Sequence, residues 1–185
     1  MTANPSSSGA PSARTLETVG AIVIVVAGTL FHFTYEWSGS SRVVGFFAPV
    51  NESVWEHLKL VLYPVLAFAV VEMKWIRDPA RLWWAKLVEV VAAVVFITAF
   101  FYTYTGALGV DSVVAIDICS FVVAVIGGQW ISYRLVVMPG PPPLPLPASL
   151  VVLASLIVLF GVFTYAPPHL PLFQQTSTGI YGPAG

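Results

Sequence analysis

Five stretches of the chain are long enough and apolar enough to cross a membrane as helices. Each is roughly 20 residues long and carries few charges, which matches the length a helix needs to cross the hydrocarbon core of a bilayer. A sixth apolar stretch, residues 43–48, is too short to span and is expected to lie at the membrane interface or to re-enter. The pattern predicts an all-α, polytopic membrane bundle of five transmembrane helices, at about residues 16–37, 51–75, 82–105, 112–137 and 148–165.

Polar or proline-rich segments separate these stretches and flank them. Residues 1–14 are rich in Ser, Pro, Ala and Gly, a composition that predicts a disordered N-terminal tail. The prolines of residues 139–147 predict a stiff linker before the last helix. Residues 167–185 are predicted to form an irregular C-terminal tail. The five-helix transmembrane domain is therefore assigned to residues 15–166.

Composition supports an integral membrane protein whose main partner is the lipid bilayer. Hydrophobic residues make up 57% of the chain and charged residues only 9%, whereas a soluble domain carries about 25% charged residues. The net charge of −1 argues against a nucleic-acid partner. The single cysteine, Cys119, falls within an apolar stretch and is interpreted as a small buried apolar side chain.

Basic residues predict the orientation of the bundle. The side that carries few of them has only Arg42, with Lys59 at a helix mouth. By the positive-inside rule, the basic side is cytoplasmic, so we predict a multi-pass protein of the cell membrane with its N-terminus in the cytoplasm and its C-terminus outside. The residues on the basic side are Arg14, Lys74, Arg77, Arg81, Lys86 and Arg134.

The densest group of polar side chains begins the second stretch, within residues 49–59. Ionisable groups are costly near a bilayer, so a cluster of them is a candidate site. Part of the group has a structural interpretation, because Ser53 and Glu56 fit a helix capping box and Lys59 can pair with Glu56. The candidate residues here are Asn51, Glu52, Ser53, Glu56 and His57.

Two other stretches add candidates on the same predicted outer side. His32 and Glu36 are four residues apart, so a continuous helix would place them on one face. Asp117 is predicted to lie two turns inside the fourth helix, where a carboxylate has no capping role. A short hairpin joins the first two stretches, and we therefore expect these residues to converge with Glu52, Glu56 and His57.

The residue types allow two kinds of chemistry. Imidazoles and carboxylates are ligands for zinc, iron or manganese, and His32, Glu36 and His57 are the candidate ligands. Carboxyl groups in an apolar pocket can instead act as general acid and base. The candidates for that role are Glu52, Glu56 and Asp117.

Further residues have a structural and a functional interpretation. Tyr35 and Tyr102 lie near the outer helix ends, in an aromatic belt or in the rim of a site. His169 in the C-terminal tail is either a solvated loop residue or part of a lid over the site. On the cytoplasmic side, Glu72 with Lys74 and Lys86 with Glu89 are interpreted as interfacial ion pairs.

Several stretches resemble an uncharacterised family of small bacterial polytopic membrane proteins with an Asn-Glu-Ser-x-Trp-Glu-His motif. The resemblance implies no known activity and no catalytic residues. A weaker likeness, to integral-membrane terpene cyclases, implies a polyprenyl substrate that Glu56 or Asp117 would protonate, beside Asn51 and Trp55. The stretches that carry the family resemblance are residues 32–39, 49–59, 102–117, 167–173 and 179–182.

Three functions remain open from the sequence. The first is a membrane-embedded enzyme with an outward-facing acid/base or metal site that acts on a lipid-like substrate. The second is a small ion or proton-coupled transporter or channel, in which the same carboxylates bind a cation or a proton. The third is a non-catalytic membrane subunit or scaffold, whose polar residues only pack helices together.

Overall fold

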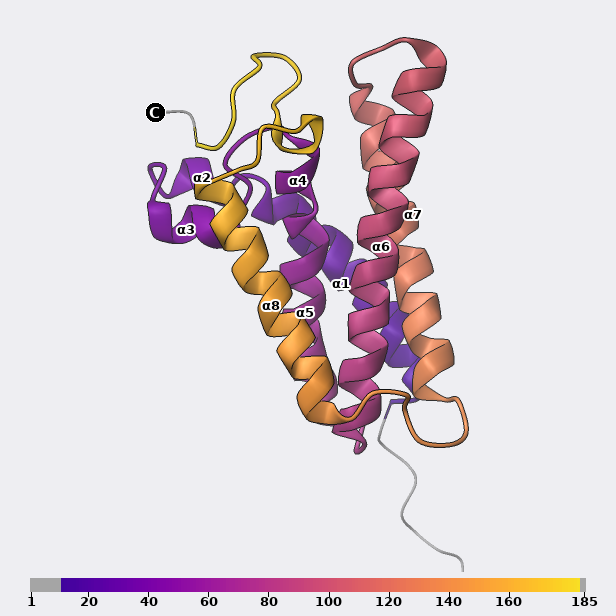
Figure 1. The fold of residues 1–185 in the computed structure, drawn as a ribbon. Coiled ribbons are helices and arrows are strands. Elements are labelled where there is room, and N and C mark those ends of the chain that lie inside the picture. The colour runs from indigo at the N-terminus through magenta and orange to yellow at the C-terminus, as the bar shows by residue number, and fades with distance from the viewer. Residues whose placement is uncertain (1–10, 184–185) are drawn as a thin grey trace, which may run out of the picture.

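The computed structural model describes residues 11–183, which fold into a helical bundle with one isolated β-bridge in the C-terminal tail (Figure 1). Residues 1–10 of the tail predicted for residues 1–14 lie outside the described range, and the first helix already begins at Ala13, capped by Ser12. The elements are α1 (Ala13–Phe31), α2 (Thr34–Trp37), α3 (Arg42–Phe47), α4 (Val54–His57), α5 (Lys59–Glu72), α6 (Pro79–Leu108), α7 (Val114–Val136), α8 (Leu146–Tyr165) and the 3-10 turn η1 (Pro171–Phe173).

Five helical segments of the described chain are long and apolar enough to cross a membrane, as predicted. They are α1, α4 with α5, α6, α7 and α8, and successive segments run in opposite directions (Figure 1). The short helices α2 and α3 and the C-terminal tail gather at one end, which we call the site end. Arg14, Lys74, Arg77, Arg81 and Arg134 all lie in helix ends or loops at the opposite end. Which end faces the cytoplasm stays a prediction.

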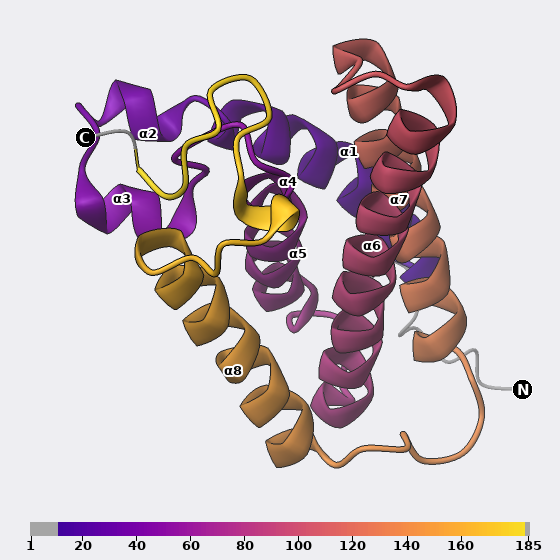
Figure 2. The same cartoon turned by 45° about the horizontal axis from the view of Figure 1, so that its top comes forward.

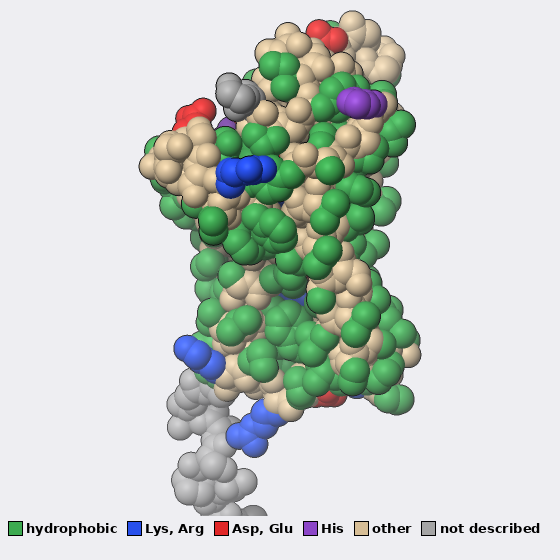
Figure 3. Space-filling view, turned by 60° about the vertical axis from the view of Figure 1, so that its left-hand side comes forward, with side chains coloured by type: hydrophobic (Ala, Val, Ile, Leu, Met, Phe, Trp, Pro, Cys, Tyr) green, Lys and Arg blue, Asp and Glu red, His purple; other side chains and the backbone are tan. Residues whose placement is uncertain are grey.

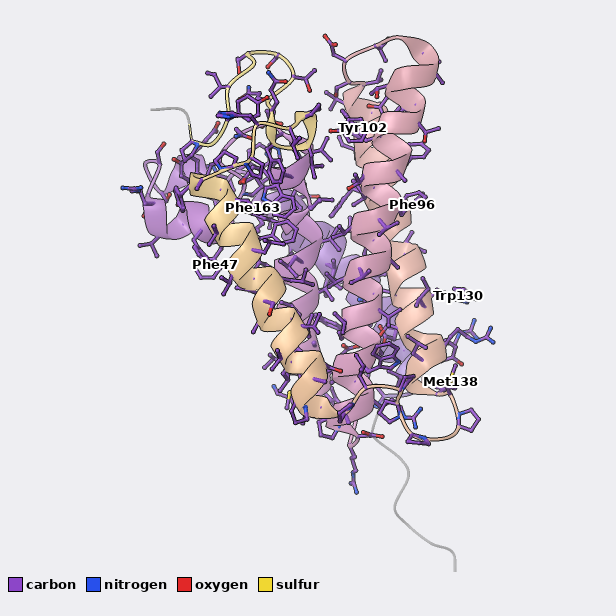
Figure 4. The ribbon with its side chains drawn as sticks, in the orientation of Figure 1. Phe47, Phe96, Tyr102, Trp130, Met138 and Phe163 are labelled. Atoms are coloured by element: carbon purple, nitrogen blue, oxygen red, sulfur yellow. The ribbon has the colours of Figure 1, made fainter. Side chains whose placement is uncertain are left out.

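The outer surface of the bundle is suited to lipid. On the face seen in Figure 3, charged side chains lie mainly toward the two ends and the middle is largely hydrophobic. Large apolar side chains such as Phe96 and Trp130 point away from the bundle and are exposed (Figure 4). Cys119 is also exposed, so its predicted burial is wrong. This surface is typical of a multi-pass membrane protein.

Helix boundaries at the site end differ from those predicted. The first helix ends at Phe31, and a turn at residues 32–33 separates it from α2, so residues 16–37 are not one continuous helix. The fourth predicted helix begins at Val114 after an N-cap at Val113. Asp117 therefore lies in the first turn of α7, where the helix dipole favours a negative charge, and not two turns inside. Both differences change the geometry of the candidate site.

A close contact between α1 and α5 sets the spacing of the site end. Pro64 has no N–H to donate to the carbonyl of Leu60, and Gly28 of α1 approaches that carbonyl. A Cβ atom on Gly28 would lie 2.6 Å from the Leu60 oxygen and 2.7 Å from the Phe121 ring. His32 lies about one turn beyond Gly28, so this contact determines how closely α1 brings His32 to α4.

Replacing Gly28 with alanine should therefore destabilise the protein. The new methyl group would overlap the backbone oxygen of Leu60, and overpacking of this kind costs about 1–3 kcal/mol. Gly127→Ala is the matched control, because a Cβ atom on that helical glycine meets nothing within 4 Å. Thermal unfolding in detergent should show a lower Tm for Gly28→Ala and an unchanged or higher Tm for Gly127→Ala. Equal Tm values in the two variants would contradict the close contact.

Candidate metal centre

Two imidazoles and one carboxylate meet at the site end. His32 is the C-cap of α1, Glu52 lies in the turn before α4, and His57 ends α4. The Nε2 atoms of the two histidines are 3.2 Å apart. Glu52 Oε1 is 3.5 Å from His32 Nε2, and Glu52 Oε2 is 3.2 Å from His57 Nε2. Among the described residues, these three form the group of side chains whose ligand atoms are close enough to hold one metal ion.

The separations fit a tetrahedral ion. Ligand atoms bound to zinc at about 2.0–2.1 Å and at tetrahedral angles lie about 3.3 Å apart. The three measured separations of 3.2, 3.2 and 3.5 Å are close to that value. Each imidazole faces a different oxygen of Glu52, so a rotation of that carboxylate would let one of its oxygens and the two Nε2 atoms bind a single ion and leave a fourth position free.

The tautomer of His57 is set by its own helix turn. His57 Nδ1 lies 2.9 Å from the backbone carbonyl of Ser53, which can only accept a hydrogen bond. Nδ1 therefore carries a proton and donates it, so Nε2, which faces His32 and Glu52, is the nitrogen available to a metal ion. Ser53 also begins α4, since its Oγ accepts a hydrogen bond from Glu56 N. The residue that starts the helix thus also orients the imidazole that ends it.

The carboxyl group of Glu52 is held in its ionised form. Hydrogen bonding with His32, and then with His57, lowers the pKa of this carboxyl well below its ordinary value, although partial burial opposes the shift. Its side chain remains more than half exposed. Glu52 is therefore available as an anionic ligand over the whole physiological pH range.

A cavity of about 510 Å³ adjoins the three ligands. Its polar lining includes Asp117, whose oxygens accept hydrogen bonds from Tyr104 and Ser112. Most of its wall is apolar, with side chains from α4, α5, α6 and α7. On the α7 side, Val114 and Ile118 line the cavity and are 71% and 58% exposed, so this wall continues onto the outer surface of the bundle.

The C-terminal tail covers this end of the protein. It folds back over α4, as both ribbon views show, and forms an isolated bridge between Gln174 and Tyr181 (Figures 1 and 2). Asn51 fixes the tail, because its Nδ2 donates to the Gly182 carbonyl at 2.8 Å while its Oδ1 accepts from Ser53 N. Thr176 and Ser177 of the tail line the cavity. Asn51 is thus an anchor of the tail and has both ends of its amide occupied.

Glu56 lies in a separate, buried network. Its Oε2 accepts hydrogen bonds from Lys59 Nζ at 2.7 Å and from Val50 N at 3.0 Å, and its Oε1 accepts one from Thr164 at 2.9 Å. Lys59 Nζ also donates to the carbonyls of Gly45 and Ala48. The network joins α3, α4 and α8. Glu56 is 2% exposed and has no position left for a substrate.

A model for a family of unknown function, DUF6512, matches residues 9–183. The chain belongs to this family. The predicted resemblance to an uncharacterised family of membrane proteins is thereby confirmed, and the comparisons give no support to the likeness to terpene cyclases. No curated protein and no solved structure matches the chain. Membership of DUF6512 therefore assigns no activity, and any function has to be argued from the site.

In this DUF6512 protein the remaining candidates lie outside the three-ligand group. Glu36 is exposed in α2, because the turn at residues 32–33 ends the helical register that would have placed it beside His32. Tyr35 packs near Gly45, and Tyr102 is 40% exposed. His169 is exposed and contacts the ring of Tyr181 edge-on.

The sequence interpretation missed a second charged cluster at the opposite end. Lys86 contacts Glu89 as predicted, but the pair is buried, and Glu17 and Glu72 join it. The prediction of simple interfacial pairs is therefore wrong for these residues, and Glu72 pairs with Lys86 and not with the exposed Lys74. The sequence did contain a signal for this cluster. Charged residues interrupt three apolar stretches, at helix ends that the predicted topology places on the same side of the membrane.

Proposed function

We propose that this protein is a membrane-embedded, metal-dependent hydrolase that cleaves an ester or amide bond of a lipid-like substrate. The observation that carries the proposal is the convergence of His32 Nε2, His57 Nε2 and the two carboxylate oxygens of Glu52, at separations of 3.2–3.5 Å, beside an apolar cavity. Two histidines and one carboxylate with an open fourth position form a ligand set of hydrolytic zinc sites.

The cavity supports a lipid-like substrate. Its walls are mainly apolar, while the candidate metal ligands and Asp117 supply polar groups in its lining. An acyl chain would bury its methylenes against the apolar walls, and a polar head would face the ligands. The exposed side chains of Val114 and Ile118 provide an apolar approach from the membrane-facing surface of α7.

The reaction follows from the ligand set and Asp117. His32, Glu52 and His57 would hold a zinc ion, which would supply Lewis acidity toward a carbonyl oxygen and toward a water molecule. The water oxygen adds to the carbonyl carbon, and the bond from that carbon to the leaving oxygen or nitrogen then breaks. Asp117 takes the proton of the attacking water and returns a proton to the leaving alcohol or amine. Tyr104 and Ser112 hold the carboxylate of Asp117 in place for both transfers.

The test is hydrolysis of a panel of fluorogenic lipid esters and amides by the zinc-loaded, full-length protein in nanodiscs. We expect cleavage by the wild type, none by His57→Ala, and a loss of about 10²–10⁴-fold in kcat for Asp117→Asn with its zinc content unchanged. Glu36→Gln is the matched control and should retain full activity, because Glu36 is exposed outside the site. Equal cleavage by wild type and His57→Ala would contradict the proposal. If the protein instead binds ferrous iron and consumes O₂, the reaction at this site would be oxygen chemistry and not hydrolysis.

A further inference from the structure

Four buried ionisable side chains from three helices meet at the end of the bundle opposite the metal centre. Lys86 Nζ lies 2.8 Å from Glu17 Oε2, 2.9 Å from Glu72 Oε2 and 3.1 Å from Glu89 Oε2. Every one of these side chains is at most 3% exposed. Gly128 of α7 makes room for the group, because a Cβ atom there would lie 3.0 Å from Glu89 Cγ. We call these four residues the inner cluster.

The inner cluster cannot be fully ionised without a large uncompensated charge. Three carboxylates and one ammonium would give a net charge of −2 in a water-poor interior. Among the described residues, Lys86 is the only cation ion-paired with these carboxylates. Arg14 lies one turn before Glu17 on α1 and lines the groove beside it without forming an ion pair with it, α7 contributes the neutral Ser132 and Gln129, and α8 has no ionisable side chain before Tyr165. Two bound protons would make the cluster neutral.

The hydrogen bonds indicate which carboxyl groups carry those protons. Glu17 accepts from Lys86 at Oε2 and from Ser132 at Oε1, so both of its oxygens are satisfied as a carboxylate. Glu72 and Glu89 each have only Oε2 near a donor, the shared Lys86 Nζ at 2.9 and 3.1 Å, and their Oε1 atoms are buried without a hydrogen-bond partner. Lys86 with Glu17 is therefore the ionised pair, and Glu72 and Glu89 are the neutral acids.

A second feature gives the cluster a route to the surface. Glu17 also lines a groove of about 740 Å³ between α1 and α7, together with Arg14, Gln129 and Tyr133. Gln129 is 2% exposed, and both ends of its amide lack a partner. It lies one turn from Ser132, the residue that contacts Glu17, and so places a donor and an acceptor at the groove, on the same face of α7 as Ser132.

We propose that the inner cluster is a proton-binding site, which holds one proton each on Glu72 and Glu89 at neutral pH and exchanges them through the groove beside Glu17 and Gln129. This site is separate from the metal centre and does not depend on the proposed hydrolysis. It gives the protein a place to take up and release protons within the bundle.

Infrared spectroscopy of the full-length protein in nanodiscs tests this site directly. We expect wild-type protein near neutral pH to show the C=O stretch of protonated, buried carboxyl groups, with the shift in D₂O that marks an exchangeable proton. Glu72→Gln and Glu89→Gln should each remove part of this signal, and Glu36→Gln, on an exposed residue, should remove none. A spectrum without protonated carboxyl groups, or one that neither glutamine variant alters, would overturn the proposal.

Thermal unfolding gives an independent readout of the charge assignment. Glutamine resembles a neutral carboxyl group, so Glu89→Gln should lower the Tm by only a few degrees. Glu17→Gln removes the carboxylate that is hydrogen-bonded to both Lys86 and Ser132, so that Glu72 or Glu89 must release its proton to replace the charge. The Tm should therefore fall by more than in Glu89→Gln, by up to about 10 °C. The reverse order would overturn the assignment. A wild-type Tm that rises with Na⁺, K⁺ or Li⁺ at constant ionic strength would assign a metal cation to the cluster in place of protons.

Discussion

Replacing Glu56 with glutamine is expected to lower the stability of the folded protein by about 3–5 kcal/mol, because it leaves the buried ammonium of Lys59 without a counter-charge. Lys59 is 0% exposed, and Glu56 is the only acidic side chain paired with it among the described residues. The change should appear as a fall in Tm of about 10 °C in detergent, followed by circular dichroism.

The same variant separates a structural role of Glu56 from a catalytic one. Glu56→Gln protein that is kept folded at low temperature should bind zinc as tightly as the wild type, since Glu56 is not part of the three-ligand group. Glu36→Gln, which alters an exposed carboxylate, should change neither property. A stable Glu56→Gln variant that has lost zinc binding would show that Glu56 belongs to the metal centre.

Replacing His57 with alanine is expected to weaken zinc binding by at least about 10³-fold, because it removes one of three protein ligands. Competition with a chelating dye measures the affinity. His169→Ala is the matched control, since His169 is exposed in the tail and outside the ligand group. Equal affinities in the two histidine variants would argue against the site.

The pH dependence of zinc binding has a defined sign. Zinc binds neutral imidazole, so affinity should fall as the solution is acidified from about pH 7 to about pH 5 and protons compete for the histidines. Glu52 should contribute little to that change, because hydrogen bonds with His32 and His57 keep the pKa of its carboxyl far below this range. An affinity that rises on acidification would contradict binding through His32 and His57.

The spans were predictable from the sequence because bilayer thickness fixes the length of an apolar helix. Contacts between residues close in the sequence could also be predicted: Lys59 contacts Glu56 at the predicted spacing, and Ser53 caps the helix that follows. Only half of the predicted capping box forms, since the Glu56 side chain reaches Val50 N and not Ser53 N. The difference arises because the Asn51 side chain already accepts the bond from Ser53 N.

The composition of the candidate metal centre was only partly predictable. The convergence of His32 and His57 follows from the short connection between two antiparallel spans. The choice of carboxylate does not, because it depends on where α1 ends: a turn after Phe31 moves Glu36 away, and Glu52 takes the third position. A shift of one or two residues in a helix end is enough to exchange one ligand for another.

Contacts between residues far apart in the chain could not be predicted from the sequence alone. Tyr104 and Ser112 hold Asp117, but neither spacing marks them as its partners. The inner cluster joins Glu17 to Lys86, 69 positions later in the chain. The spacing of apolar residues in one sequence predicts the faces and the ends of helices. These pairings depend in addition on how α1, α5, α6 and α7 pack against one another, which that spacing does not give.

The most direct test of the metal centre is elemental analysis of the purified, full-length protein after zinc loading and gel filtration. The geometry of His32, Glu52 and His57 predicts one zinc ion per chain in the wild type and none in the His32→Ala/His57→Ala double variant, with both proteins folded by circular dichroism. Wild-type protein that retains no zinc, iron or manganese after loading with each metal, or a double variant that retains as much as the wild type, would contradict the account.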